Sequence, residues 1–219
     1  ELIEKNAFWN SPIRRIVIPS NTRLSEGWCS LTSNLDEVKL IPRKDPILML
    51  TDDNLIIGKS DTKSDIFDVL LFCPRVNKTA TIPPSVCRIE SYSFDCSSIV
   101  NLVIPPNVTH IGTHAFAQTK FLNSIEFSVD SKLEVIDELA FYESNVMKIS
   151  IPSCVSKLGD GWIAQTNRLR EINVIQNEKQ NILFYQNNFI VGKSDIKSDI
   201  YDDLIYVSSK LRIAKVPPF

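Results

Sequence analysis

The chain repeats a short motif about every 23 residues, and this period limits the folds open to it. Each copy has the pattern apolar-x-apolar, and a proline often follows the second apolar residue. The last apolar residues lie at positions 18, 40, 82, 104, 127, 151, 174 and 216, in steps of 22, 42, 22, 23, 24, 23 and 42. A unit of this length cannot bury its apolar side alone, so neighbouring units must stack on a shared core. We therefore predict a solenoid.

A second pattern lies between these motifs and places two spaced apolar residues before an aromatic one. Val86, Ile89 and Phe94 form one copy, and the next copy ends at Phe116. Each unit is therefore predicted to contain a short strand, a turn and a short apolar segment that returns the chain. The fold class that follows is a strand-dominated solenoid with one curved parallel sheet.

The two 42-residue steps share one explanation. Residues 27–85 and 161–219 align without a gap at an offset of 134, and within them the polar segments 58–68 and 192–202 differ at only two positions. Apolar runs flank both segments, which predicts a β-hairpin in each long unit. We expect one domain over 1–219, a fragment of a longer array, with hairpin units at about 27–85 and 161–219 and plain repeats at about 86–160.

Composition argues against several classes of protein. The 24 Lys and Arg residues balance 26 Asp and Glu residues, which leaves no cationic excess for nucleic acid. The longest apolar run, 69–73, has five residues, far short of a membrane span. Membrane attachment is expected only through a segment outside this fragment. The five cysteines share no spacing, and buried free thiols are favoured over one or two disulfides.

Three motifs resemble chemical sites, and each has a simpler explanation. The Gly-Lys-Ser segments at 58–60 and 192–194 lack the earlier glycine of a phosphate loop. Lysines interleave the aspartates of the two polar segments, so a solvated turn is favoured over a Ca²⁺ site, which stays the alternative. His110 and His114 flank Gly112 rather than sharing a helix face, which disfavours zinc. We expect no enzyme activity, cofactor or metal.

The predicted strands define an outward column of side chains that offers a protein-contact surface rather than a small-molecule pocket. The charged residues of this surface that we expect to contact a partner are Arg15, Lys39, Glu126, Lys148 and Glu171, and its exposed apolar residues are Val17 and Val103. The two polar hairpin segments form a second candidate patch. The alternative is that all of these are ordinary solvated strand residues.

Two consecutive units carry a resemblance to a known family. Residues 81–99 and 104–116, with Ile104-Pro105, Val108, Ile111-Gly112 and Ala115-Phe116, resemble BspA-like leucine-rich repeats, whose unit reads I-P-x-x-V-x-x-I-G-x-x-A-F-x-x-C-x-x-L-x-x-I. The Gly-Lys-Ser-Asp segments are similar to those of BspA-like surface proteins of parasitic protists. The chain departs from the motif at Glu90, at Trp28 and Trp162, and in unit 125–148, which has no proline after its strand.

This resemblance implies a leucine-rich-repeat solenoid of the repeat α/β class, dominated by strands. It also implies a cell-surface or secreted protein that binds a protein ligand on host cells or extracellular matrix. Two other functions stay open: a passive structural or antigenic coat or spacer, and an intracellular protein-interaction scaffold. No nucleic acid and no small-molecule substrate is expected as a partner.

Overall fold

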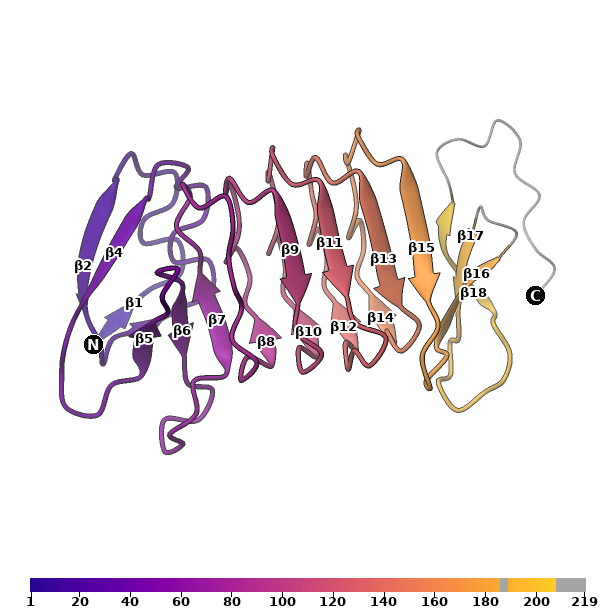
Figure 1. Ribbon diagram of the computed structural model, residues 1–219, viewed down its shortest axis with the longest axis horizontal. Helices are drawn as coiled ribbons and strands as arrows, with labels where there is room; N and C mark the ends of the chain where they lie inside the picture. Colours follow the sequence, from indigo (N-terminus) through magenta and orange to yellow (C-terminus); the bar gives the residue numbers. More distant parts are fainter. Residues whose placement is uncertain (186–188, 208–219) are drawn as a thin grey trace.

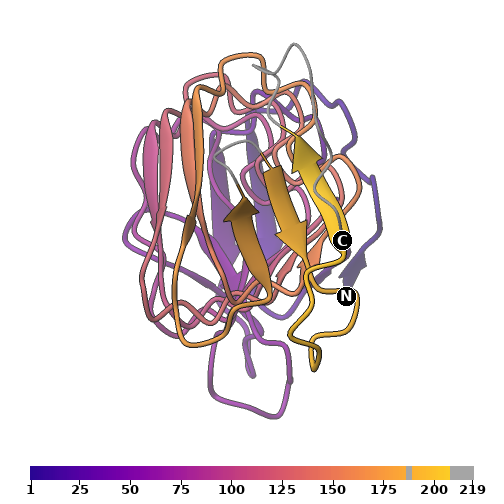
Figure 2. The same cartoon turned by 90° about the vertical axis from the view of Figure 1, so that its right-hand side faces the viewer.

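The computed structural model describes residues 1–185 and 189–207 and confirms the predicted strand-dominated solenoid. The coils stack in a row from the N-terminus to the C-terminus, and the described residues contain no helix (Figure 1). A regular coil contributes a strand to a first row, a two-residue strand to a second row and a turn to a third row. Seen along the stack, the coils superimpose (Figure 2).

The first row contains the predicted strands. They are β2 (Arg15–Pro19), β4 (Glu37–Ile41), β9 (Asn101–Ile104), β11 (Ser124–Phe127), β13 (Lys148–Pro152) and β15 (Glu171–Ile175). All neighbouring pairs are parallel, in one sheet of β2 and β4 and another of β9, β11, β13 and β15. Alternate side chains point inward, so Leu102 and Ile104 are buried while Val103 between them is exposed.

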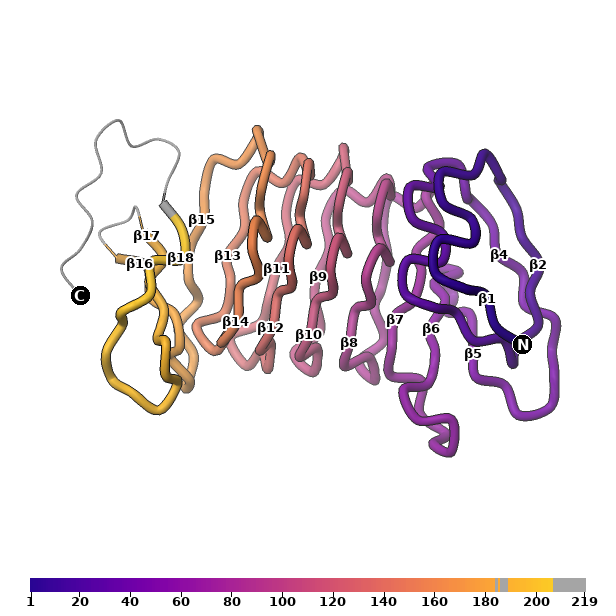
Figure 3. The backbone as a smooth tube through the Cα atoms, turned by 180° about the vertical axis from the view of Figure 1, so that it is seen from behind, coloured from indigo at the N-terminus to yellow at the C-terminus, as the bar shows by residue number. Residues whose placement is uncertain are grey.

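The second row consists of short parallel strands that the sequence pattern placed only as apolar return segments. They are β1 (Leu2–Ile3), β3 (Arg23–Leu24), β8 (Arg88–Ile89), β10 (His110–Ile111), β12 (Val135–Ile136) and β14 (Lys157–Leu158). The strands β8, β10, β12 and β14 follow one another in a single sheet, whereas β1 pairs only with β3. Figure 3 shows this row from behind.

The two long units contain the predicted antiparallel hairpins, each extended by one strand that the sequence did not reveal. The first has β5 (Leu48–Leu50), β6 (Ile56–Gly58) and β7 (Val69–Phe72), and β7 then pairs in parallel with β8. The second has β16 (Ile182–Tyr185), β17 (Phe189–Gly192) and β18 (Asp203–Val207). The polar loops between the hairpin strands extend past the same edge of the stack (Figure 1).

The two loops have the same internal hydrogen bonds, which explains their near-identical sequences. In the first, the Ser60 main-chain N–H donates to Asp68 at 2.8 Å, and in the second Ser194 donates to Asp202 at the same distance. A serine hydroxyl bond to the same carboxylate is also present in both loops. Each Asp therefore closes its loop from the opposite strand.

The third row is a stack of turns held by main-chain bonds between coils. Phe94 N–H donates to Ala115 C=O at 2.8 Å, and Phe116 N–H donates to Ala140 C=O at 2.8 Å. Each turn has two residues with positive φ, four positions apart. These pairs are Asn6 and Asn10, Gly27 and Leu31, Tyr92 and Cys96, His114 and Gln118, Leu139 and Glu143, and Gly161 and Gln165. Because most of these residues are not glycine, the positive φ angles could not be predicted from residue type.

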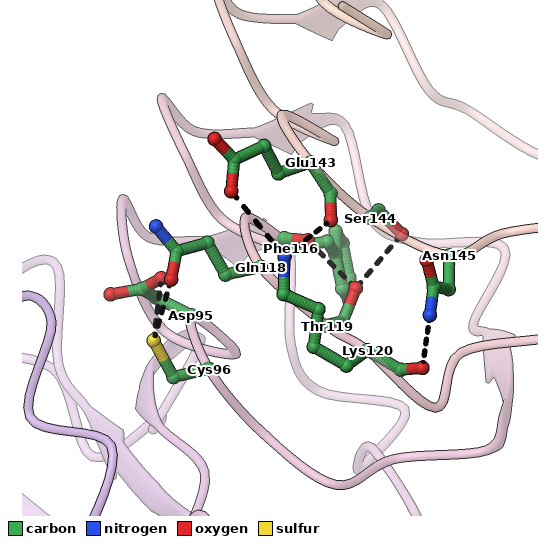
Figure 4. Close-up of polar contacts among 9 residues, drawn as sticks. All are labelled: Asp95, Cys96, Phe116, Gln118, Thr119, Lys120, Glu143, Ser144 and Asn145. Carbon is green, nitrogen blue, oxygen red and sulfur yellow. Dashed lines mark hydrogen bonds and ion pairs between the residues drawn. The ribbon is translucent and has the colours of Figure 1, made fainter. Parts of the chain in front are cut away.

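Side chains of the turns also bond from coil to coil (Figure 4). The Thr119 hydroxyl lies 2.9 Å from both the Phe116 carbonyl oxygen and the Ser144 hydroxyl. At the surface, Lys120 Nζ lies 3.3 Å from Glu143 of the next coil. Under the turns, Phe94, Phe116 and Phe141 stack with ring centroids about 5 Å apart. This aromatic column forms the centre of the core.

One predicted first-row strand is absent. Residues 79–82 fit the repeat motif and keep its alternating exposure, but they form no strand. The Thr81 main-chain N–H donates instead to the Asp53 carboxylate at 2.7 Å, and Asn77 binds the Asp53 carbonyl oxygen. Asp53, in the turn between β5 and β6, thus forms hydrogen bonds with residues that would otherwise pair with a neighbouring strand. The first-row sheet is therefore interrupted between β4 and β9. The expected strand at 214–216 lies outside the described residues.

Two buried polar side chains, Arg75 and Asp95, join the first hairpin unit to its neighbours. Arg75 is 2% exposed, and its guanidinium reaches the carbonyl oxygens of Ser93 at 3.1 Å and of Tyr92 and Cys73 at 3.4 Å. Asp95, also fully buried, accepts the Leu31 main-chain N–H at 2.8 Å. Burial raises the pKa of Asp95, an effect that the charge of Arg75 partly offsets. Through these bonds the two side chains link the main chains of adjacent coils.

Substitution of Arg75 is expected to weaken the fold substantially. Arg75→Met keeps most of the volume but removes the guanidinium hydrogen bonds to three carbonyl oxygens and the positive charge that offsets the burial of Asp95, which costs about 3 kcal/mol of unfolding free energy. Urea unfolding measures this loss, with Arg43→Met at an exposed position as the matched control. An Arg75→Met midpoint equal to that of the control would contradict the role assigned to Arg75.

The cysteines are free, and most are shielded. Cys29, Cys73 and Cys154 are buried, Cys96 is half-buried and Cys87 is exposed. Burial raises the pKa of Cys29 to about 11 and that of Cys73 to about 12. The pKa of Cys96 is likewise raised to about 12, by burial and by the adjacent Asp95. The predicted burial of the cysteines is correct for Cys29, Cys73 and Cys154 and wrong for Cys87, which lies at the surface.

We expect one cysteine to react quickly in the native protein. A disulfide reagent that reacts with thiols at about pH 8 should modify Cys87 within seconds and the other four cysteines far more slowly. The thiolate is the reactive form, and the reagent must also reach it from solvent. The measurement is the number of thiols per molecule that react quickly. We expect one in the native protein and none in Cys87→Ser. Two or more fast equivalents in native protein would refute it.

Candidate protein-binding surface

The outward face of the first row carries all seven residues predicted to contact a partner. Parallel register sets Arg15 opposite Glu37 and Val17 opposite Lys39, and it sets Val103 opposite Glu126. On the later strands Lys148 lies opposite Glu171. Val17 and Val103 are 57% and 63% exposed, which is unusual for valines on a strand. All seven side chains are therefore exposed on the strands of the first row.

Most charges on this surface are paired, either across strands or along one strand. Glu37 binds both Arg15 at 2.9 Å and Lys39 at 3.2 Å. Lys148 binds Glu171 at 3.0 Å. These pairs are exposed and contribute little to stability, but they leave the two ends of the face nearly neutral. The part between the pairs carries Val103 and Glu126, and among described residues Glu126 has no ion-pair partner.

A hollow of about 330 Å³ opens in this middle part. Its lining comes from residues 79–82, from β9 with Pro105, and from Glu126 on β11. It lies where the missing strand interrupts the row, beside Val103. The sequence did not indicate this hollow, because it depends on the distant Asp53 that keeps residues 79–82 out of the sheet.

The interruption also divides the candidate residues into two groups. Arg15, Val17 and Lys39 lie on the β2–β4 sheet, and the other four lie on the sheet from β9 to β15. Of the second group, Val103 and Glu126 line the concave apolar spot, and the Glu126 carboxylate has no ion pair with any described residue, whereas Lys148 and Glu171 lie on the next two strands. Such a surface suits a protein ligand that inserts an apolar side chain and offers a cation to Glu126.

The hairpin loops present a different surface, at the edge of the stack. Ile66 is 60% exposed in the first loop, and Ile196 and Ile200 are 59% and 62% exposed in the second. Lys59 covers the Phe67 ring at 5.0 Å, and Lys193 covers the Tyr201 ring at 5.2 Å. The ammonium groups of Lys59 and Lys193 thus each contact an aromatic ring of their own loop.

The two histidines lie in different environments. His110 on β10 binds Asp137 at 2.7 Å, and Lys157 binds the other oxygen of the same carboxylate at 3.0 Å. His114 stacks on Tyr92 in the third row, with ring centroids 5.0 Å apart. Within residues 1–185 and 189–207, no three His, Cys, Asp or Glu side chains form a group able to hold a metal ion.

Asp137 gives the second row a pH dependence. Burial opposes its ionisation, but the Lys157 hydrogen bond and His110 outweigh burial and hold the pKa of Asp137 below 3.8. Because the pKa of Asp137 is lower in the folded than in the unfolded protein, its ionised carboxylate stabilises the fold at pH values above the unfolded pKa. This stabilisation is lost as the pH falls through the folded pKa. Asp137→Asn should therefore lower the unfolding free energy by about 1 kcal/mol near pH 7.

The difference between wild type and Asp137→Asn should shrink as the pH falls below 3.8, because the wild-type carboxylate then becomes protonated. Urea unfolding at about pH 7 and about pH 3 measures it, with Asp160→Asn at an exposed site as the control. A difference that is unchanged or larger at the lower pH would show that Asp137 acts through its shape rather than its charge.

No element among the described residues is a helix of the length and apolar character needed to cross a membrane. A search of curated proteins found no match to the chain. Solved structures do match. A leucine rich cell surface protein from Faecalibacterium prausnitzii A2-165 is 26% identical, with a TM-score of 0.59 over 79% of this chain and 51% of that chain.

Two further structures share the fold at lower identity. A leucine-rich repeat protein from Eubacterium ventriosum is 18% identical, with a TM-score of 0.54 over 78% of this chain and 51% of that one. The pneumococcal vaccine antigen PcpA is 17% identical, with a TM-score of 0.57 over 82% and 55%. The chain thus spans about half the length of each of the three structures.

The repeat motif also matches a family model. The BspA type leucine rich repeat region matches residues 71–190 in six copies, which is more than half of the chain. The matched range runs from the first hairpin into the second and includes every plain repeat. The chain belongs to the BspA type leucine-rich repeat family.

Proposed function

We propose that this chain is a non-enzymatic recognition module that binds a protein ligand on the outward face of its first row. The hollow beside Val103 and Glu126 is the observation that carries the proposal. The hollow has a concave shape, an exposed valine, and a carboxylate that forms no ion pair with the residues the structure describes. These features favour one anchor residue of a partner. The ion pairs on either side form a polar rim.

We further propose that the module acts at a cell surface and adheres to host cells or extracellular matrix. The cell-surface protein of F. prausnitzii, which shares the fold and is 26% identical over the aligned residues, supports a surface location. Leucine-rich-repeat solenoids supply extended surfaces that suit protein partners. The competing functions are a passive coat or spacer and an intracellular scaffold.

A binding assay with labelled protein on cultured epithelial cells and on immobilised fibronectin and laminin tests this function. We expect saturable binding that Val103→Arg weakens at least about tenfold, because the arginine occupies the hollow. Val129→Arg is the matched control, since Val129 is 67% exposed on a loop outside the face. Both variants must first show the wild-type unfolding midpoint.

A triple charge reversal at Lys39, Glu126 and Lys148 locates the site independently. Loss of binding in this variant and in Val103→Arg supports the first-row face. Binding that all variants retain moves the site to the hairpin loops. Absence of saturable binding by folded wild type on every surface refutes adhesion and favours the coat or spacer.

A further inference from the structure

The second row has an open edge at β3. Main-chain bonds join the coils of this row at one recurring position, where an N–H of one coil donates to the C=O of the preceding coil. The acceptor carbonyls are those of Ile3, Leu70, Ile89, Ile111 and Ile136, each at 2.8–2.9 Å from its donor. Leu24 on β3 occupies the same position, yet no donor among the described residues reaches its carbonyl oxygen.

The direction of the free groups follows from the strand's other bonds. The N–H groups of Arg23 and Ser25 donate to Glu1 and Ile3, so these two residues face β1. Main-chain groups of successive strand residues point to opposite sides, so the Leu24 N–H and C=O face the open edge. An edge of this kind is a template for another strand.

The interruption of the second row after β3 is caused by the first hairpin unit. β5 turns to pair with β6, and so the row resumes only at β7 and β8. Leu158 precedes the second hairpin unit at the position equivalent to Leu24, and among described residues its carbonyl also lacks a main-chain donor. Both hairpin units therefore open the row at the strand before them.

A hollow of about 710 Å³ lies beside the open edge of β3. Apolar side chains of Leu24, Trp28, Leu48 and Leu71 form part of its wall, and the buried Trp28 Nε1 finds no acceptor in the described part of the chain. The volume is in the range of ligand-binding pockets. Free main-chain groups above an apolar floor are the two elements of recognition by strand addition.

The charge at the edge selects one kind of segment. Arg23 begins the open edge and is exposed, with no ion pair among described residues, whereas Arg88 across the hollow is paired with Glu90 at 2.8 Å. On the first row the equivalent cross-strand neighbours are opposite charges, as in Arg15 and Glu37. An acidic residue opposite Arg23 completes the same pattern.

We infer that the open edge of β3 and its hollow bind an extended peptide segment of a partner protein, which adds a parallel strand. The segment carries an acidic residue opposite Arg23 and an apolar residue opposite Leu24, over the apolar wall. The residue after the apolar one donates its N–H to the Leu24 carbonyl, as Gly112 does to Ile89. This site lies on a different row from the proposed adhesion face, and the two stand independently.

Fluorescence anisotropy with a labelled peptide, TVTDLTVT, tests the site. We expect saturable binding. N-methylation of the threonine after leucine removes one main-chain donor and keeps every side chain, so it should lower the affinity at least about tenfold. Arg23→Glu should weaken binding about fivefold and restore it for TVTKLTVT. Arg43→Glu, an exposed arginine outside the hollow, is the matched control.

The outcomes separate the possibilities. Loss on N-methylation together with the charge-swap rescue supports strand addition at β3. Equal binding of the methylated and unmethylated peptides overturns strand addition, and so does equal binding by Arg23→Glu and Arg43→Glu. Failure of both the TVTDLTVT and the TVTKLTVT peptide to bind the folded wild-type protein also overturns the proposal, whatever the cell-binding assay shows.

Discussion

Every coil of this protein depends on main-chain hydrogen bonds to the coils beside it. Two-residue strands and single turns have no stability of their own, so a coil is ordered only while its neighbours offer matching donors and acceptors. The bonds from Phe94 to Ala115 and from Gly112 to Ile89 show this dependence in two different rows. The apolar interior then follows from the same stacking, since each Phe of the aromatic column meets the next one at about 5 Å.

The first hairpin unit interrupts this pattern and therefore needs side chains to replace it. Arg75 and Asp95 satisfy main-chain groups in the third row, and Asp53 does so in the first row. In the second row no side chain within residues 1–185 and 189–207 replaces the missing bond at Leu24. Hollows open at the interruption in the first and second rows. The features that distinguish this chain from a uniform repeat thus gather at its hairpin unit, and we place both proposed binding sites beside it.

The regular part of the fold was predictable because its signal is periodic. Residues such as Leu102 and Ile104 recur at fixed steps, and their alternation predicts strand, face and burial together. The outward positions of Val103 and Glu126 follow from the same alternation. The second-row strands were not predicted, since two residues cannot show a period. The absent strand at 79–82 and the hollow beside it depend on Asp53, which lies in a hairpin turn some 28 residues earlier and has no local signature. Left-handed turn residues such as Tyr92 and Leu139 escaped notice because stacking, not residue type, imposes their φ.

Native-state hydrogen exchange tests the central claim most directly, namely that the rows are continuous except at the hairpin units. The main-chain amides of Ile89 and Leu24 occupy equivalent positions, one inside a continuous row and the other at its open edge. The account predicts that the Leu24 amide exchanges at least about a hundredfold faster than the Ile89 amide. Equal protection of the two amides would contradict it, because it would mean that the second row is closed at β3.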